Sequence, residues 1–174
     1  VISSAVKKNN KELIASKNKK LPVFKRGEML ANIVALKKNI VVAGSHGKTT
    51  TTSLTANILE EAGLDPTIIN GGVINSLKNT AHLGKGEWAV IESDESDGSF
   101  LKLPVAYSIV TNIDNEHLDF YKSFDRLKDS FRSFIEKTPS FGKSIICLDN
   151  NNLKSLLYKC RTSNFLTYGF DKQS

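Results

Sequence analysis

The sequence has no long hydrophobic run. No apolar stretch approaches the roughly 20 residues that a membrane-spanning helix needs, and the chain does not open with a charged segment followed by an apolar one. We therefore expect neither a membrane span nor a signal peptide. An initiating Met is also absent, which suggests a piece of a longer chain. Apolar residues make up 40% and charged residues 24% of the 174 residues, as in a globular protein with one domain, or one domain and part of another.

Cysteines and aromatic residues are scarce where metal or nucleic-acid binding would need them. The two cysteines, Cys147 and Cys160, lie thirteen positions apart, which is no metal-ligand spacing, and we expect reduced thiols in a cytoplasmic protein. Residues 1–38 hold ten Lys or Arg against two Glu, but their only aromatic residue is Phe24. A solvated, lysine-rich surface is therefore favoured over a polyanion site, and no nucleic-acid partner is expected.

A glycine-rich turn connects an apolar run to a helical pattern. Ile40–Ala43 predicts a buried strand, and Thr49–Ala62 predicts a helix. In such a turn, backbone N–H groups, the helix N-terminus and a lysine together hold phosphate, and a hydroxyl can ligate Mg²⁺. We expect Lys48 at the β- and γ-phosphates and Thr49 at Mg²⁺, in a nucleotide site made of Gly44, Ser45, His46, Gly47, Lys48, Thr49 and Thr50.

The turn departs from the general phosphate-loop pattern at one position. That pattern has its first glycine six residues before the lysine, where this chain has Val42. An ordinary strand, turn and helix with a chance Gly-Lys-Thr is therefore the alternative. For His46, packing or hydrogen bonding is favoured over catalysis.

Strands and helices alternate along the rest of the chain. Gly63 is expected to cap the first long helix, which would carry an inward stripe of Leu54, Ile58, Leu59 and Ala62, and Gly71-Gly72 to make a turn. This alternation predicts an α/β fold with a mostly parallel sheet covered by helices on both faces. The expected strands are Val1–Val6, Leu21–Phe24, Pro66–Asn70, Trp88–Glu92, Val105–Thr111, Lys143–Leu148 and Phe165–Tyr168; the expected helices are Asn10–Ser16, Arg26–Leu36, Ser123–Lys137 and Asn151–Tyr158.

Polar residues follow three of the predicted strands. The phosphate loop follows the first, Glu92 to Asp97 another, and Asn112 to Asp119 a third. In a parallel sheet these carboxyl ends meet at one edge, where ligands collect. Glu92 is expected to share Mg²⁺ with Thr49, and His117 to ligate a second cation. The alternatives are a solvated acidic turn for Glu92–Asp97 and a structural side chain for His117; His82 has no expected role.

Taken together, these motifs resemble the Mur ligases. The resemblance rests on ordered segments that span most of the chain, and the short phosphate loop with Val42 is itself the form that this family has. The segments are Gly44–Thr52, Asn70–Gly72, Glu92–Asp97 with Ser99–Leu101, Thr111–Ile113, and His117–Asp119 with Tyr121. Val1–Ala5 and Leu21–Leu30 look like the end of the family's first, UDP-binding domain.

The resemblance implies a domain organisation and an activity. Residues 1–38 would be the tail of the UDP-binding domain, and residues 39–174 an incomplete central ATP-binding domain. The implied reaction joins L-alanine to UDP-N-acetylmuramate through an acyl phosphate, uses ATP and Mg²⁺, and belongs to peptidoglycan precursor synthesis in the cytoplasm. A recycling ligase that adds a whole peptide, and a non-catalytic nucleotide-binding module, are the alternatives. The chain alone is expected not to ligate.

The resemblance also implies roles for single residues. Lys48 would neutralise charge on the transferred phosphoryl group, Thr49 and Glu92 would hold the Mg²⁺ of ATP, and His117 would hold a second Mg²⁺. Lys48, Glu92 and His117 are thus the expected catalytic residues. Weaker assignments to the substrate side are Asn70, Gly71, Gly72, Asp94, Glu95, Ser96, Asp97 and Asn112.

Overall fold

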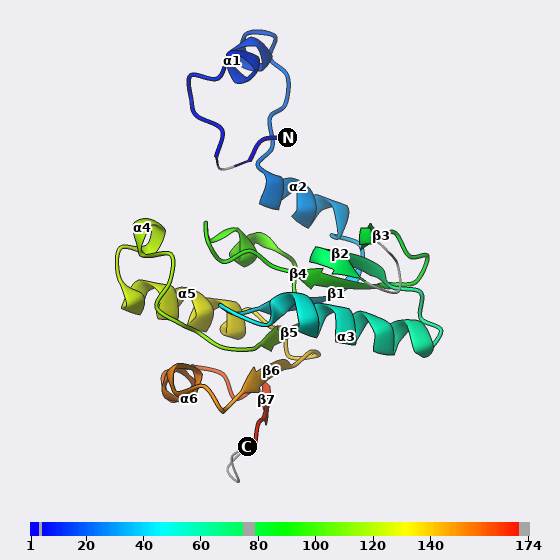
Figure 1. The fold of residues 1–174 in the computed structure, drawn as a ribbon, viewed down its shortest axis with the longest axis vertical. Coiled ribbons are helices and arrows are strands. Elements are labelled where there is room, and N and C mark those ends of the chain that lie inside the picture. Colours follow the sequence, from blue (N-terminus) through cyan, green and yellow to red (C-terminus); the bar gives the residue numbers. More distant parts are fainter. Residues whose placement is uncertain (4, 75–78, 171–174) are drawn as a thin grey trace.

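The chain folds into a seven-stranded sheet with helices on both faces (Figure 1). The structure, a computed structural model, describes residues 1–3, 5–74 and 79–170. The elements in chain order are α1 Lys11–Asn18, α2 Arg26–Ile33, β1 Lys38–Ala43, α3 Lys48–Glu61, β2 Thr67–Ile74, β3 Asn79–His82, β4 Trp88–Glu92, the 3₁₀ helix η1 Ser99–Lys102, β5 Tyr107–Val110, α4 Leu118–Tyr121, α5 Phe124–Glu136, β6 Ser144–Cys147, α6 Asn151–Leu157 and β7 Phe165–Tyr168.

The first strand of the sheet, β1, lies at its centre. The strand order is β3-β2-β4-β1-β5-β6-β7, and every pairing is parallel except that of β2 with β3. Val42 pairs with Glu92 of β4, and Ala43 pairs with Val110 of β5. The predicted, mostly parallel sheet is confirmed, and the three chemistry-bearing strand ends lie side by side.

Apolar side chains pack on both faces of the sheet. On one face, Val41 and Ile91 share a large core with aromatic residues of η1 and α5, among them Phe100, Phe131 and Phe134. On the other, Val90 and Ile68 pack against Ala56 of α3. Alternate residues of β4 therefore serve opposite faces, as the period of a strand requires.

Helix α5 forms as its sequence predicts. Ser123 accepts a hydrogen bond from the Arg126 N–H as the N-cap, and Asp125 lies in the first turn, where the helix dipole favours an acid. Five side chains of this helix were predicted to face inward. Phe124 is partly buried and packs against the core, and the other four are fully buried: Leu127, Phe131, Phe134 and Ile135.

Helix α2 is docked on the sheet domain. Val34, just after the helix, is fully buried in the larger core, and Leu30 packs against that core. Two exposed ion pairs connect the same region, Arg26 to Asp94 at 2.6 Å and Glu28 to Lys102 at 2.6 Å. Residues before 39 thus contribute to the core that carries the site.

The predicted strands near the amino end are wrong. Of Val1–Val6, only Ile2 forms a bridge, with Lys25, and Leu21–Phe24 is irregular. A short apolar run needs a neighbouring strand to complete its hydrogen bonds, and Pro22 lacks an N–H group. Helix α1 forms with Asn10 as its N-cap. Residues 4, 75–78 and 171–174, which include Ser4 of the predicted strand, lie outside the described residues.

Two further predictions about β2 and α3 are wrong. Gly71 and Gly72 do not form a turn but lie inside β2, where the register with β3 shifts between Ile69 and Ile74. Strand β3 was not predicted. In α3, Leu54 and Ile58 are 59% and 68% exposed, whereas Thr52 and Ala56 face the sheet. Gly63 does follow the helix with φ of 72°, in the left-handed region that suits glycine.

Both cysteines are free thiols. Burial raises the pKa of the Cys160 thiol. Among the helices of the described part of the chain, none is long and apolar enough to cross a membrane.

Candidate functional site

The phosphate loop joins the carboxyl end of β1 to the start of α3. Gly44 and Gly47 have φ of 144° and 78°, which L side chains rarely adopt, and a Cβ on Gly44 would lie 2.0 Å from Oγ1 of Thr111. Among the described residues, the N–H groups of Gly47, Lys48, Thr49 and Thr50 have no hydrogen-bond partner. These groups, at the positive end of the helix dipole, form a site suited to an anion.

Lys48 points back across the loop toward a buried carboxylate. Its Nζ lies 2.5 Å from the Gly44 carbonyl oxygen, 3.3 Å from that of Ser45 and 2.9 Å from Oε1 of Glu95. The side chain of Lys48 is 15% exposed and that of Glu95 is 4% exposed. This ion pair is therefore largely shielded from water.

Thr49 and Glu92 lie together, from the ends of two neighbouring elements. The Thr49 hydroxyl donates to Oε1 of Glu92 at 3.1 Å, and the Gly71 N–H donates to Oε2 at 2.6 Å. A Cβ on Gly71 would lie 2.8 Å from the Glu92 carboxylate, and one on Gly72 would lie 2.9 Å from Thr49. The two glycines of β2 thus allow the strand to approach this pair closely.

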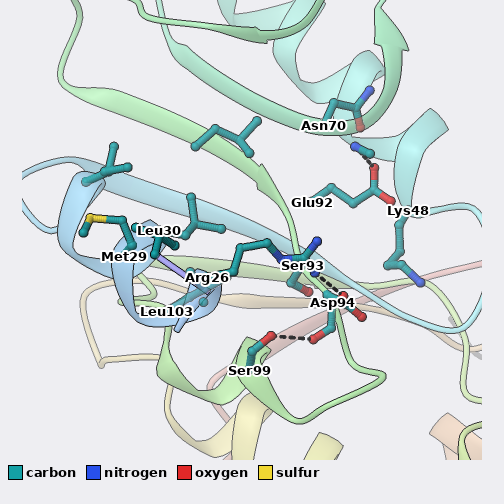
Figure 2. Close-up of a pocket in the computed structure, with 15 residues that line it drawn as sticks. Arg26, Met29, Leu30, Lys48, Asn70, Glu92, Ser93, Asp94, Ser99 and Leu103 are labelled. Carbon is teal, nitrogen blue, oxygen red and sulfur yellow. Dashed lines mark hydrogen bonds and ion pairs between the residues drawn. The ribbon is translucent and has the colours of Figure 1, made fainter. Parts of the chain in front are cut away.

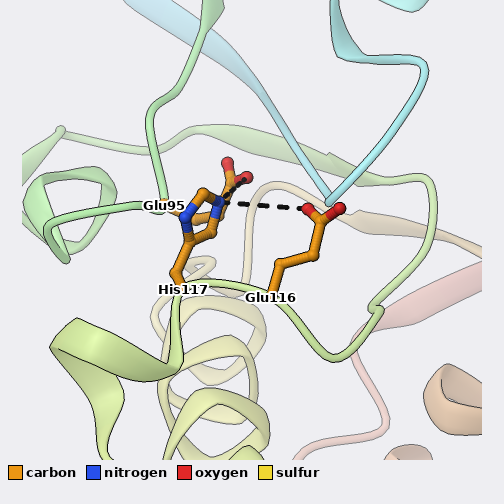
Figure 3. Close-up of side chains that lie close together, drawn as sticks. All are labelled: Glu95, Glu116 and His117. Atoms are coloured by element: carbon orange, nitrogen blue, oxygen red, sulfur yellow. Dashed lines mark ion pairs between the residues drawn. The ribbon is translucent and has the colours of Figure 1, made fainter.

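His117 lies beside two acids (Figure 3). Its Nε2 is 3.3 Å from Oε1 of Glu95 and 4.0 Å from Oε2 of Glu116. Its φ of 56° lies in the left-handed region, as do those of three other non-glycine residues among the described ones, Lys20, Asp65 and Lys122. Tyr121 donates to the Glu95 carbonyl oxygen, and burial, followed by the charge of Glu95, raises the pKa of this phenol well above its usual value.

Both clusters have the chemistry of cation ligands. A hydroxyl beside a carboxylate, as at Thr49 and Glu92, suits Mg²⁺, which prefers oxygen ligands and keeps several waters. Possible ligand atoms of Glu95, Glu116 and His117 all lie within 4.8 Å of one another. Oε2 of Glu95 is buried without a hydrogen-bond partner, so this group still has an acceptor to satisfy. Both donor sets therefore fit a divalent cation.

The acidic residues of the turn after β4 have different partners. Asp94 accepts hydrogen bonds from Ser96 and pairs with Arg26, and Asp97 accepts the Ser99 N–H at the start of η1. Burial works to raise the pKa of Asp94, but the hydrogen bonds from Ser96 and the charge and hydrogen bond of Arg26 outweigh it and lower that pKa. Of this turn, Glu95 is the residue that reaches Lys48.

Asn70 and Asn112 lie on different sides of the loop. Asn70 donates to the Ser53 hydroxyl at 3.0 Å, and its Oδ1 is buried without a partner. Both polar atoms of the Asn112 side chain contact the backbone of His46. The His46 ring lies 3.3 Å from Asp114 and 3.6 Å from Glu116, and its packing or hydrogen-bonding role stays a prediction.

A cavity of about 500 Å³ opens beside Glu92 (Figure 2). Lys48, Asn70 and Glu92 line one side, and apolar side chains of α2, including Met29 and Leu30, lie across from them. The sequence indicated the polar side of this cavity, but the apolar wall depends on how α2 docks.

The structure brings Thr49 and Glu92 together but gives His117 other neighbours. Within the described residues, His117 contacts Glu95 and Glu116, and no ion pair or hydrogen bond joins it to Glu92. The roles of these residues stay predictions. Sequence reasoning missed Glu116, which precedes His117, and placed Glu95 only weakly on the substrate side. The sequence did not predict that Lys48 would pair with a buried carboxylate.

Comparison with known proteins gives a consistent family. The Mur ligase middle domain matches residues 42–174. The UDP-N-acetylmuramate--L-alanine ligase of Pelagibacter ubique is 64% identical over the whole chain, which spans 38% of that relative's length. The UDP-N-acetylmuramate-alanine ligase structure from Thermotoga maritima has a TM-score of 0.84 and 26% identity, over 98% of this chain and 38% of its own. A UDP-N-acetylmuramate:L-alanyl-gamma-D-glutamyl-meso-diaminopimelate ligase from Neisseria meningitides has a TM-score of 0.83 and 26% identity, over 94% of this chain and 56% of its own.

Proposed function

The chain belongs to the Mur ligase family, and from this premise we propose that it carries the ATP site of an enzyme that joins L-alanine to UDP-N-acetylmuramate. The observation that supports this most is the cluster at the adjoining ends of β1 and β4. There, Thr49 and Glu92 are in hydrogen-bond contact beside the unpartnered N–H groups of the phosphate loop. A reaction of this kind would take place in the cytoplasm, where ATP is available.

Two parts of the chain would have different tasks. Residues 1–38 would belong to a UDP-binding domain, and residues 39–174 would form most of the central, ATP-binding domain. The docking of α2 against η1 supports an arrangement in which the two parts border one cavity.

The cavity suits a substrate with both apolar and anionic parts. Lys48 and the loop N–H groups would bind the triphosphate, while Asn70 and Gly71 at the cavity wall would face the sugar nucleotide. Oδ1 of Asn70, buried and unpartnered, would accept a hydrogen bond from a hydroxyl or N–H group of that substrate. The Met29 and Leu30 side chains would exclude water from that side.

The chain's residues would act mainly by position and charge. The substrate carboxylate would attack the γ-phosphorus of ATP, giving an acyl phosphate and ADP, and the L-alanine amine would then displace phosphate. Lys48 would exchange Glu95 for the transferred phosphoryl group and neutralise its charge. Thr49 and Glu92 would hold Mg²⁺, and His117 a second cation. When bound, the metal would draw charge from the phosphate oxygens.

A peptide-recycling ligase is the second candidate. The TM-score of 0.83 to the ligase from Neisseria meningitides nearly equals that to the alanine ligase from Thermotoga maritima, so the fold does not separate the two. The 64% identity to an L-alanine ligase favours the first candidate.

The test is phosphate release by the full-length protein that contains this chain. With ATP, Mg²⁺ and UDP-N-acetylmuramate, L-alanine should support turnover and the tripeptide L-alanyl-γ-D-glutamyl-meso-diaminopimelate should not. Glu92→Gln should lower kcat by roughly a hundredfold or more, because it removes a metal ligand. Glu87→Gln, at an exposed ion pair just before β4, is the matched control and should retain activity. Turnover with the tripeptide alone would favour the recycling ligase, and full activity in Glu92→Gln would refute the proposed site.

A further inference from the structure

The backbone N–H and carbonyl groups of His46, at the middle of the phosphate loop, are both hydrogen-bonded to the segment that follows β5. The Asn112 side chain contacts it twice: Oδ1 accepts the His46 N–H at 2.8 Å, and Nδ2 donates to the His46 carbonyl oxygen at 3.0 Å. The Thr111 hydroxyl donates to that same carbonyl at 2.7 Å. One residue of the loop therefore has three hydrogen bonds to two neighbouring side chains.

These contacts continue the ladder between β1 and β5 beyond the end of both strands. The Thr111 N–H donates to the Ala43 carbonyl at 3.1 Å, and the Ser45 N–H donates to the Asn112 carbonyl at 3.1 Å. The carboxamide of Asn112 then supplies the next donor and acceptor in place of backbone groups. Gly44 lies so close to Thr111 that no side chain fits between them.

The contacts also decide which loop N–H groups are available to a ligand. The N–H groups of Ser45 and His46 are taken by Asn112, whereas those of Gly47 to Thr50 have no partner among the described residues. Without Asn112, the peptide group between His46 and Gly47 could rotate, and the Gly47 N–H would then point in another direction. A loop that samples several shapes binds its ligand more weakly, because only the fraction in the binding shape is competent.

We propose that Asn112, assisted by Thr111, is a positioning residue that holds the phosphate loop in its nucleotide-binding shape before the nucleotide arrives. Its task is then on the ATP side, and not on the substrate side to which the family resemblance assigned it. This inference rests on the proposed function, because it takes the ligand of the loop to be a nucleotide.

The experiment compares variants of the full-length protein. Asn112→Ala removes both side-chain contacts, Thr111→Val removes the hydroxyl while keeping the shape, and Thr111→Ser keeps the hydroxyl. Asn152→Ala is the matched control, because Asn152 also donates to a backbone carbonyl of this segment, that of Ile113 at 2.8 Å, but does not contact the phosphate loop.

Two measurements are made on each variant. Hydrogen–deuterium exchange, read by mass spectrometry on peptides that cover residues 44–50 without nucleotide, reports on the loop itself. Calorimetric Kd for ATP and the KM for UDP-N-acetylmuramate report on the two ligands. Asn112→Ala should exchange faster in these peptides and raise the Kd for ATP by roughly ten- to thirtyfold, the effect of losing two net hydrogen bonds.

The other variants show whether the effect depends on the hydrogen bonds to His46. Thr111→Val should raise the Kd for ATP by about threefold to tenfold, with Thr111→Ser and Asn152→Ala within about twofold of the unaltered protein. The KM for UDP-N-acetylmuramate should change little in any of them. Thr111→Val also tests the inference if Asn112→Ala fails to fold.

Two results would overturn the inference. One is a raised KM for UDP-N-acetylmuramate in Asn112→Ala with an unchanged Kd for ATP, because it would return Asn112 to the substrate side. The other is unchanged exchange at residues 44–50. An unaltered protein that does not bind ATP would instead overturn the proposed function, while the exchange data would still show whether Asn112 holds the loop.

Discussion

Replacing Glu95 by glutamine should weaken the fold and at the same time strengthen metal-free ATP binding. In the structure, Oε1 of Glu95 lies 2.9 Å from Nζ of Lys48 and 3.3 Å from Nε2 of His117, in a carboxylate side chain that is only 4% exposed. The same lysine is the group that a triphosphate would attract. In the proposed ATP site, Glu95 would therefore be both a stabilising partner of Lys48 and a competitor of the ligand.

The loss of stability follows from the burial of the pair. At 2.9 Å and an effective dielectric constant of about 20, the attraction is about 6 kcal/mol before desolvation is subtracted. Removing one partner of a buried pair costs about 3–5 kcal/mol in other proteins. In Glu95→Gln, Lys48 is not left isolated, because the new side-chain carbonyl can still accept and the carbonyls of Gly44 and Ser45 remain. We expect a loss of about 2–3 kcal/mol, or a Tm lower by about 5–10 °C.

The gain in affinity follows from the loss of a negative charge near the phosphates. Removing this like charge beside the phosphates relieves a repulsion of about 1 kcal/mol, which is roughly fivefold in Kd. Differential scanning calorimetry of the full-length protein gives Tm, and titration with ATP in EDTA gives Kd. The matched control is Glu87→Gln, whose ion pair with Lys38 is also 2.9 Å long but lies in solvent, and its Tm should move by less than about 2 °C.

Either measurement can refute this reasoning. An unchanged Tm in the Glu95 variant would show that the buried pair contributes nothing to stability. Weaker metal-free ATP binding would show that the carboxylate orients Lys48 for the ligand and does not compete with it.

Three other changes test different parts of the structure. Gly71→Ala should raise the Mg²⁺ concentration for half-maximal activity by roughly tenfold with little change in Tm, because a Cβ would push the Glu92 carboxylate aside; an unchanged Mg²⁺ requirement would contradict this. Phe131→Ala should lower the free energy of unfolding by about 3–5 kcal/mol in urea titrations, because its ring is fully buried against Phe100, and a loss below about 1 kcal/mol would contradict the core packing. The fold lowers the pKa of Asp94, so its ionised form stabilises the protein above about pH 4 and this contribution is lost as the pH falls through the lowered pKa. The stability difference between the unaltered protein and Asp94→Asn should therefore shrink from about pH 5 to about pH 3, and a constant difference would contradict it.

The sequence predicted best those elements whose pattern and packing agree. Trp88–Glu92 is a strand with the predicted bounds, and Phe124–Glu136 is a helix whose buried residues were named in advance. Helix α3 shows the limit, because it has apolar residues on two faces. Thr49 must face the site, and Thr52 and Ala56 follow it on the same side at helical spacing, so the larger Leu54 and Ile58 face outward.

For the candidate site, the sequence identified residues better than their partners. Parallel strands predicted that the loop, Glu92 and His117 would approach one edge, which they do. The sequence could not show that Glu95 turns inward to Lys48, because alternate residues of an irregular turn have no fixed period. Nor could it show that Gly71 donates to Glu92, since that contact depends on β2 continuing past the residue that looked like a turn.

The hydrogen bond from Gly71 to Glu92 has a thermodynamic consequence. Gly71 lines the cavity, and its N–H group fixes the carboxylate that sits against Thr49. If a cation binds Thr49 and Glu92 as proposed, a molecule that shifts this stretch of β2 would alter the cation's affinity, and reciprocity would require the cation to alter that molecule's affinity by an equal factor. Binding on one side of the strand would thus affect the other side through a single amide.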